Sequence, residues 1–220
     1  MVKKVLIIGL FILFVTSASG QQHFWGVQFG VASTNIDDDK LILSDDQLVE
    51  SRRTGLNAGL TYQYRVAKRF QLGFDILYAE KGENYELIPP DFDPDDVFRF
   101  MWNYQYISMP IKCGFSLGER FAGFTNVGIV PSWLLYGEFM MTSNTILTNP
   151  ENITREGNRF DLSGLLELGV RYQINKRYVI YGQAAYQRSF TNINFGADWF
   201  EEGEYHEGII FSLGMRRSFK

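Results

Sequence analysis

The feature that most constrains this chain is a repeated alternation of bulky apolar residues with small or polar ones. One segment reads Trp25, Gly26, Val27, Gln28 and Phe29. Because successive side chains of a β-strand point to opposite faces, such a segment predicts a strand with one bulky apolar face and one small or polar face. Eight segments follow or approach the pattern: residues 25–31, 56–64, 70–78, 107–115, 121–136, 162–172, 178–188 and 209–219.

The connections between these segments alternate in length. The short ones are residues 65–69, 116–120 and 175–177, and the long ones are residues 35–51, 82–103, 137–160 and 191–207. Each segment is close to the ~9–11 residues that a tilted strand needs to cross a bilayer. The sequence therefore predicts an all-β fold: an eight-stranded antiparallel up-and-down transmembrane β-barrel with short periplasmic turns and four long outer loops.

A secreted soluble barrel of the lipocalin type is the alternative, and the two faces of the strands argue against it. The face opposite the bulky residues carries small residues and charged or amide side chains: Gln63, Asp75, Lys112, Asn126, Glu167, Arg171 and Arg216. The lumen of a small barrel has room for such residues but not for rings throughout, so the bulky face is expected to contact lipid. We expect the five charged residues of the set to pair inside the barrel, where an unpaired charge is costly. Eight strands leave no aqueous channel, which predicts a non-porin.

The N-terminus has the pattern of a secretory signal peptide. Lys3 and Lys4 precede an apolar run at residues 5–15, and Ala18 and Gly20 stand at the −3 and −1 positions of a cleavage site. A retained helical anchor is the alternative, but the run is shorter than the ~20 apolar residues that span a bilayer. We therefore predict a signal peptide at residues 1–20 and a barrel domain at residues 21–220.

Charge and cysteine content exclude several functions. Without Lys3 and Lys4, the basic residues fall from 21 to 19 against 25 acidic ones, so the formal charge changes from −4 to −6. Such an acidic chain does not favour nucleic acid as a partner. Cys113 is the single cysteine, which excludes an internal disulfide, and its place on the apolar face predicts a small hydrophobic residue.

A basic residue followed by an aromatic one ends each short turn: Arg69-Phe70, Arg120-Phe121 and Arg177-Tyr178. The chain ends on Phe219 and Lys220. In a membrane barrel these rings would form an aromatic girdle at one rim, whereas in a soluble protein they would simply begin the strands. Trp102, Trp133 and Trp199 near the long loops fit a girdle at the other rim.

The long loops are acidic. Carboxylates cluster at Asp37–Asp39, Asp45–Asp46 and Asp91–Asp96, and again at Asp198, Glu201, Glu202, Glu204 and Glu207. Such clusters are candidate Ca²⁺ ligands, but their spacing lacks the EF-hand pattern, and solvated surface loops are the simpler interpretation. Asn152-Ile153-Thr154 is a glycosylation sequon, which has meaning only in a glycosylating pathway. We commit to no metal or cofactor site.

An enzymatic function is not expected. The chain has two histidines, His23 and His206, and it lacks the Gly-x-Ser-x-Gly elbow of a serine hydrolase. Ser189, His206 and Asp198 are the triad that a barrel hydrolase would use here, but no sequence feature fixes their geometry. We therefore assign no catalytic residue.

Several short motifs resemble the PorT-like outer-membrane β-barrel family. Residues 77–82 (LYAEKG) are similar to its L-Y-x-x-K-G signature, residues 106–111 (YISMPI) to its Y-x-x-x-P-hydrophobic strand, and residues 169–172 (GVRY) to its G-V-x-Y strand. Tyr186 followed by residues 191–193 resembles its seventh strand and the exit from it. The resemblance implies an eight-stranded outer-membrane barrel. The member that gives the family its name is an accessory of type IX secretion, needed for export or maturation of secreted proteases, whereas many members have no assigned task.

Two functions follow from these observations, both in the outer membrane. One is an accessory or interaction component of a secretion or envelope assembly, with envelope proteins and outer-membrane lipid as partners. The alternative is a surface-exposed adhesin or receptor that binds through its long acidic loops.

Overall fold

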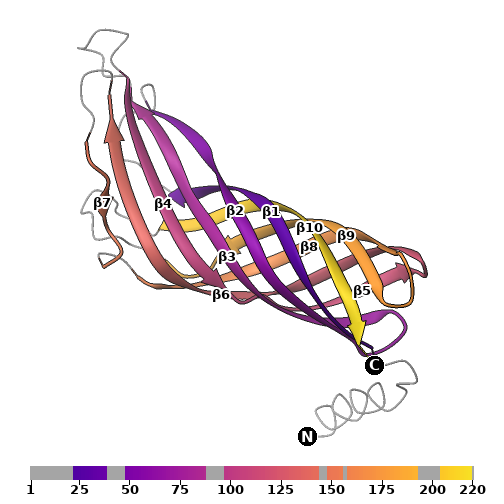
Figure 1. Cartoon of the computed structure of the whole chain (residues 1–220). Coiled ribbons are helices and arrows are strands. Elements are labelled where there is room, and N and C mark those ends of the chain that lie inside the picture. Colours follow the sequence, from indigo (N-terminus) through magenta and orange to yellow (C-terminus); the bar gives the residue numbers. More distant parts are fainter. Residues whose placement is uncertain are drawn as a thin grey trace, which may run out of the picture.

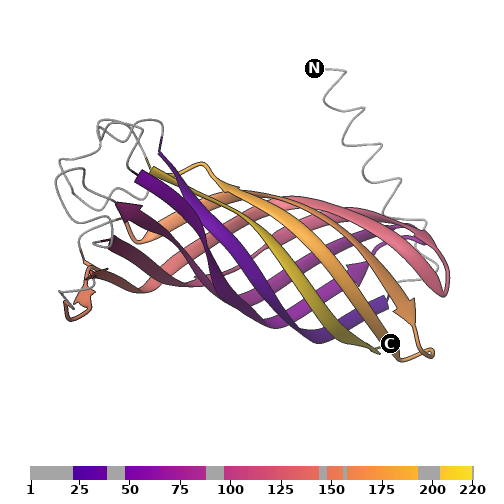
Figure 2. The same ribbon diagram turned by 90° about the horizontal axis from the view of Figure 1, so that it is seen from above.

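The computed structural model describes residues 22–38, 48–87, 97–143, 148–155, 158–192 and 204–219. In this part of the chain all regular structure is β-strand, arranged as the tilted cylinder of Figures 1 and 2. No helix among these residues is long and apolar enough to cross a membrane. The expected signal peptide at residues 1–20 lies outside the described residues. The strands are β1 (Gln22–Asp38), β2 (Leu48–Arg65), β3 (Phe70–Leu87), β4 (Phe98–Ser108), β5 (Ile111–Gly118), β6 (Phe121–Thr142), β7 (Glu151–Asn152), β8 (Phe160–Gln173), β9 (Tyr178–Ser189) and β10 (Glu204–Phe219).

The strands form a closed antiparallel ring. Neighbours follow the order β2-β1-β10-β9-β8-β6, then β4 with β5, then β3, which pairs with β2 and closes the ring. β4 and β5 are two pieces of one wall strand, because both pair with β3 on one side and with β6 on the other. β7 pairs with β6 outside the ring. Among the described strands, eight therefore cross the wall, as the sequence predicts.

The predicted fourth strand, residues 107–115, is interrupted at Met109 and Pro110. Proline has no N–H to give to the ladder, so regular pairing stops there. The Met109 N–H donates to the Pro131 carbonyl at 2.8 Å, and the Asp75 N–H donates to the Pro110 carbonyl at 3.0 Å. These two bonds keep both neighbours attached across the break, so the wall stays continuous.

The two faces of the wall lie as the sequence predicts. Bulky apolar side chains point outward, as in Phe29 at 64% exposure and Leu213 at 73%. Polar side chains point inward, with Asp75 and Glu167 at 1% and 2%. Cys113 is exposed on the apolar face. This inside-out pattern is that of a barrel surrounded by lipid, and it excludes the lipocalin-type alternative.

The lumen is filled in layers. Between a polar cluster in the half near the short turns and another in the outer half lie the apolar side chains Val130, Leu165 and Ala185, against which Ile210 packs, together with buried polar residues that include Gln28, Asn57 and Ser108. Close packing of this kind is expected in a barrel of eight strands.

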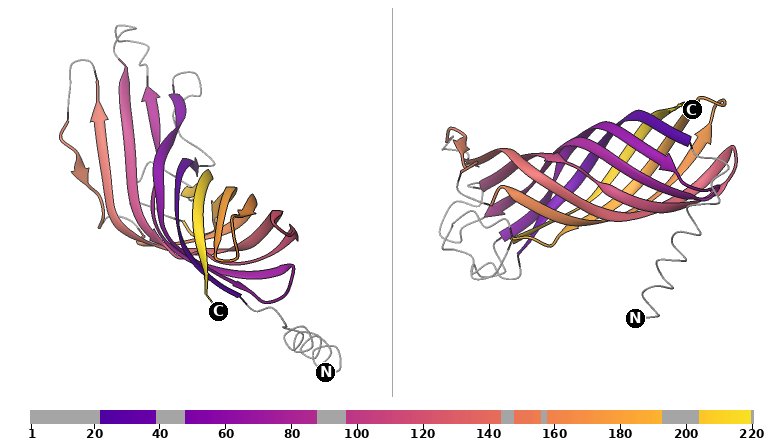
Figure 3. Two further views of the ribbon diagram at one scale, coloured as in Figure 1. Left: turned by 45° about the vertical axis from the view of Figure 1, so that its right-hand side comes forward. Right: turned by 90° about the horizontal axis from the view of Figure 1, so that it is seen from below.

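Four strands rise past the others at the outer end. β1 leaves β2 beyond the pair Thr34–Arg53, and β8 leaves β6 beyond Phe160–Trp133. Residues 48–52, 81–87, 98–105 and 136–142 continue as a separate sheet with β7 at its edge, which we name the wing. The left view of Figure 3 shows it standing away from β8, β9 and β10.

The wing corrects the predicted loop boundaries. Residues 35–38, 48–51, 82–87, 98–103, 137–142 and 204–207 were expected in the long loops and are strand instead. Alternation in them is blurred because residues above the membrane face water or other side chains and not lipid.

The aromatic residues of the short-turn repeat lie on the outer surface. Phe70, Phe121 and Phe219 are 39%, 64% and 43% exposed. The Arg120 guanidinium lies 5.2 Å from the centre of the Tyr172 ring, and Arg217 lies at the same distance from Phe219. Rings beside cations at one rim have the arrangement of an interfacial girdle.

Candidate functional site

The inner polar layer is centred on Lys112. β5 directs this side chain into the lumen, where its Nζ lies 2.7 Å from Asp75 Oδ2 and 2.9 Å from Glu167 Oε2. All three residues are at least 95% buried. One ammonium between two carboxylates compensates half of their formal charge and gives each carboxylate a cationic partner, which lowers the cost of such deep burial.

Amide side chains extend this cluster. The Gln183 Nε2 donates to Glu167 Oε2 at 2.9 Å, and Asn126 donates to the other Glu167 oxygen. Gln71 donates to Asn126 Oδ1 at 2.8 Å and accepts from Gln63. These contacts join five wall strands across the lumen.

Neither arginine of the predicted charge network contacts a carboxylate, and Arg216 joins the cluster only through Gln63. Arg216 donates to Thr61 Oγ1 and Gln63 Oε1 and stacks on Tyr181, with 3.9 Å from guanidinium to ring centre. Arg171 donates to Ser116 Oγ at 3.4 Å. The predicted ion pairing is thus confirmed for Asp75, Lys112 and Glu167 and wrong for Arg171 and Arg216, whose donors reach Ser116, Thr61 and Gln63 in place of a carboxylate.

A second ion pair lies in the outer half of the lumen. Lys81 Nζ contacts Asp161 Oδ2 at 2.7 Å, and both side chains are buried. Ser163 and Thr191 donate to the same carboxylate at 3.2 Å. This pair ties β3 to β8 across the barrel, and sequence reasoning missed it. The alternation of residues along β3 could have indicated this pair, because it places Lys81 on the lumen face.

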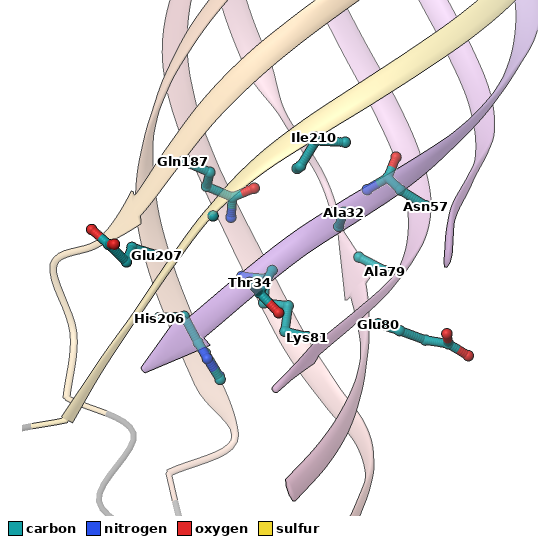
Figure 4. Close-up of a pocket in the computed structure, with 11 residues that line it drawn as sticks. Ala32, Thr34, Asn57, Ala79, Glu80, Lys81, Gln187, His206, Glu207 and Ile210 are labelled. Atoms are coloured by element: carbon teal, nitrogen blue, oxygen red, sulfur yellow. The ribbon is translucent and has the colours of Figure 1, made fainter. Parts of the chain in front are cut away.

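His206 lies beside this pair, in the pocket drawn in Figure 4 with Thr34, Lys81 and Gln187. Its Nε2 is 3.2 Å from the Tyr106 hydroxyl. Ser189 Oγ is 3.2 Å from Ser163 Oγ, so the candidate nucleophile and base have different hydrogen-bond partners. Asp198, the third member of the considered triad, lies outside the described residues.

The outer mouth is closed by apolar packing. Ile36 of β1 is buried with Tyr104, Tyr106, Leu134 and Ile153. The Ile36 N–H donates to Glu83 at 3.2 Å, and the Thr34 hydroxyl donates to the Gly82 carbonyl at 2.9 Å. These contacts hold the outer end of β1 against wing residues of β3 and β4, and Trp102 and Phe139 pack against the same apolar cluster.

The inner face of the wing carries an aromatic cluster. Trp102 contacts Tyr85 edge-on, with 5.5 Å between ring centres, and Phe139 at 4.9 Å. Phe100 stacks on both Trp102 and Phe139. Tyr85 is buried, whereas the other three rings are half-buried. Trp102 therefore belongs to the wing and not to the expected girdle, whereas Trp133 is 49% exposed on the outer surface. Trp199 lies outside the described residues.

The acidic clusters fall mostly on residues that the structure does not describe, among them Asp91–Asp96 and Asp198. Glu207 is described and contacts Arg52 at 3.2 Å, which joins the wing to β10. Within the described ranges, no group of three His, Cys, Asp or Glu side chains is placed to hold a metal ion. Ile153 and Thr154 of the sequon are buried, and the Thr154 N–H donates to the Asn152 side chain.

The closed ring with its apolar exterior and polar interior defines a small outer-membrane β-barrel protein, located in the cell outer membrane. Residues 19–207 match the family model described as outer membrane protein beta-barrel domain. The chain therefore belongs to this family. No curated protein matches it.

Solved structures similar to the chain are outer-membrane proteins of low sequence identity. Ail, the attachment invasion locus protein of Yersinia pestis, is 13% identical, with 90% of this chain and 99% of Ail covered and a TM-score of 0.43. OprG of Pseudomonas aeruginosa is 12% identical, with 92% and 97% covered and a TM-score of 0.47. Neisserial surface protein A is 12% identical, with 89% and 97% covered and a TM-score of 0.46.

Proposed function

We propose that this protein is a non-porin, non-enzymatic binding protein that contacts a macromolecular partner at the cell surface through the wing. The observation that carries the proposal is the extension of four strands beyond the ring, with half-buried Phe100, Trp102 and Phe139 on one face. A barrel that served only as an anchor would have no need of this extra sheet. Aromatic side chains are enriched where protein surfaces bind partners.

The lumen supports this assignment because its three buried carboxylates are already paired with lysines. The carboxylates of Asp75 and Glu167 both contact Lys112, and that of Asp161 contacts Lys81. A lumen of this kind stabilises the barrel. Binding then falls to the outer end, where loops on a rigid scaffold commonly recognise partners.

Replacement of Asp91–Asp96 by an equal length of Gly and Ser tests the proposal. This segment joins β3 to β4, which are both wing strands. Cells that display the natural chain or the variant are compared for binding to immobilised glycans and matrix proteins, and solubilised membranes for co-purifying envelope proteins. We expect the variant to insert normally and to lose binding. Phe100→Ser is expected to act in the same direction, and Trp133→Ser, outside the wing, to bind as the natural chain does.

A role in protein secretion is the second candidate, supported by the PorT-like motifs. In the structure those residues have architectural positions: Lys81 pairs with Asp161, Gly82 has a φ of 149°, and Pro110 lies at the β4–β5 break. The similarity of these motifs to the PorT-like family is therefore accounted for by a common barrel architecture more directly than by a common function. A deletion strain distinguishes the two roles, because loss of mature proteases from the medium would support secretion and an unchanged level would support surface binding.

A further inference from the structure

Three arginine side chains gather in the lumen at the end with the short turns. Arg65 is the last residue of β2, Arg171 lies two residues before the end of β8, and Arg216 lies three residues before the end of β10. Arg171 and Arg216 are each 5% exposed. The charges of Arg65 and Arg216 both act on Arg171, and charge repulsion is strong where water is excluded.

Their hydrogen bonds are unequally satisfied. Arg216 donates to Thr61 and Gln63. Arg171 donates through Nη2 alone, at 3.4 Å to Ser116, and its buried Nε and Nη1 have no acceptor among the described residues. Arg65 donates through Nη1 to Gln22 at 3.3 Å and lies over the Phe24 ring, but its buried Nε has no acceptor among the described residues. Unsatisfied guanidinium donors in a buried place are costly, so a native structure normally supplies them with an acceptor.

The two carboxylates of this half of the lumen contact Lys112, and neither contacts an arginine among the described residues, although the buried Asp75 Oδ1 accepts no hydrogen bond there. Glu167 lies on the same face of β8 as Arg171, two residues earlier, but its two oxygens accept from Asn126, Lys112 and Gln183. Asp75 contacts Lys112. Counting the described lumen-facing residues of this half, four cations (Arg65, Lys112, Arg171 and Arg216) face two anions (Asp75 and Glu167), a difference of +2.

We propose that Arg65 and Arg171 bind one phosphate group at the periplasmic mouth of the barrel. A phosphate carries up to two negative charges and several acceptor oxygens, which matches both the excess of +2 and the free donors. Guanidinium groups bind phosphate oxygens in pairs through their planar fork. The site is separate from the wing and does not depend on the proposed surface function.

The bound phosphate group could come from either of two sources, which present the same chemical group to the arginines. One is free phosphate or a phosphate monoester in the periplasm. The other is a phospholipid headgroup of the inner leaflet, which lies at the level of the Phe70, Phe121 and Phe219 rings.

Thermal unfolding in an uncharged maltoside detergent tests the site with inorganic phosphate as the probe and chloride of equal ionic strength as the reference. We expect phosphate to raise the Tm of the natural chain. Arg171→Met and Arg65→Met should each weaken the apparent phosphate affinity, taken from the dependence of Tm on phosphate concentration, about tenfold. Arg171→Met in chloride should melt above the natural chain, because a buried uncompensated charge has been removed. Arg69→Met, at an exposed turn position, should keep the full phosphate effect.

Equal Tm values of the natural chain in phosphate and in chloride would overturn the proposal, as would an equal loss in Arg69→Met. If Arg171→Met does not fold, Arg65→Met and Arg171→Lys report on the same donors, and Arg171→Lys should recover only part of the effect. Native mass spectrometry of protein extracted from phosphatidylglycerol vesicles then identifies the source. One retained lipid that Arg171→Met loses indicates the headgroup, whereas a phosphate effect without retained lipid indicates the free anion.

Discussion

The inner half of the lumen and the wing belong to the same strands but are held together differently. In the inner half every wall strand has two neighbours, and buried ion pairs and amides join the wall across its diameter. In the wing β2 and β7 have one strand neighbour each among the described residues, and an aromatic cluster on one face is joined by the exposed ion pairs Arg99–Glu86 and Arg52–Glu207. We therefore assign membrane anchoring to the inner half, where each strand is paired on both sides. We assign partner recognition to the wing, whose sequence can vary without breaking the ring of strands.

The largest effect is expected at the centre of the inner half. Lys112→Met leaves Asp75 and Glu167 as two buried carboxylates without their shared cation, which should lower the free energy of unfolding by about 3–5 kcal/mol. Denaturant unfolding in detergent or lipid vesicles measures it. Lys68→Met is the control, because Lys68 and Glu119 form an exposed pair. Equal stability of the two variants would show that the inner cluster does not hold the barrel.

A slightly smaller effect is expected on the lipid face of the same half. Leu168 is 58% exposed on the outside of β8. Leu168→Arg places a charge in hydrocarbon, which costs about 2–4 kcal/mol near the middle of a bilayer, whereas Leu168→Phe should be tolerated. Folded yield and the shift between boiled and unboiled samples on a gel compare the two variants. If arginine is accepted as readily as phenylalanine, the outward assignment of this face is wrong.

In the wing, Trp102→Ala should act locally. The substitution removes ring contacts to Tyr85, Phe100 and Phe139 but leaves the ring of eight strands intact. We expect amide hydrogen exchange at residues 81–87 and 98–104 to accelerate about tenfold, with global unfolding unchanged. Acceleration that extends equally to β9, far from the wing, would contradict the separation of the two regions.

The smallest effect on stability is expected from the Gly and Ser replacement of Asp91–Asp96. The replaced segment joins β3 to β4, whose outer ends belong to the wing, so denaturant unfolding should match that of the natural chain while partner binding is lost. Loss of stability as large as that of Lys112→Met would mean that this loop belongs to the framework of the barrel.

Strand number, wall direction and lumen polarity could all be predicted because lipid imposes a strict alternation. On β8, Leu166 and Leu168 face lipid and must be apolar, whereas Glu167 and Arg171 face the lumen and avoid the hydrocarbon. The same requirement holds for every strand that crosses the membrane. Above the membrane the rule ends. The strands at residues 82–87 and 98–103 alternate only weakly, and the sequence therefore predicted loops there.

The sequence identifies which charged residues face the lumen but not which of them contact one another. Alternation places Asp75, Lys112, Glu167, Arg171 and Arg216 in the lumen, but which of them meet depends on the stagger between strands. Lys81 and Asp161 show the same limit, since they lie 80 positions apart and meet only because the barrel closes. The distance between two residues in the sequence does not indicate such a contact.

The pairing of β1 with β10, from His23–Phe219 to Asp38–Glu204, joins the two ends of the chain. Until the last strand has been synthesised and exported, β1 and β9 each keep an edge of unpaired N–H and C=O groups, which in hydrocarbon has no substitute partner. Insertion of the barrel is consequently expected to require β10 as well as the other wall strands. A chain truncated before residue 204 should remain with periplasmic chaperones or be degraded, even though it contains every other wall strand.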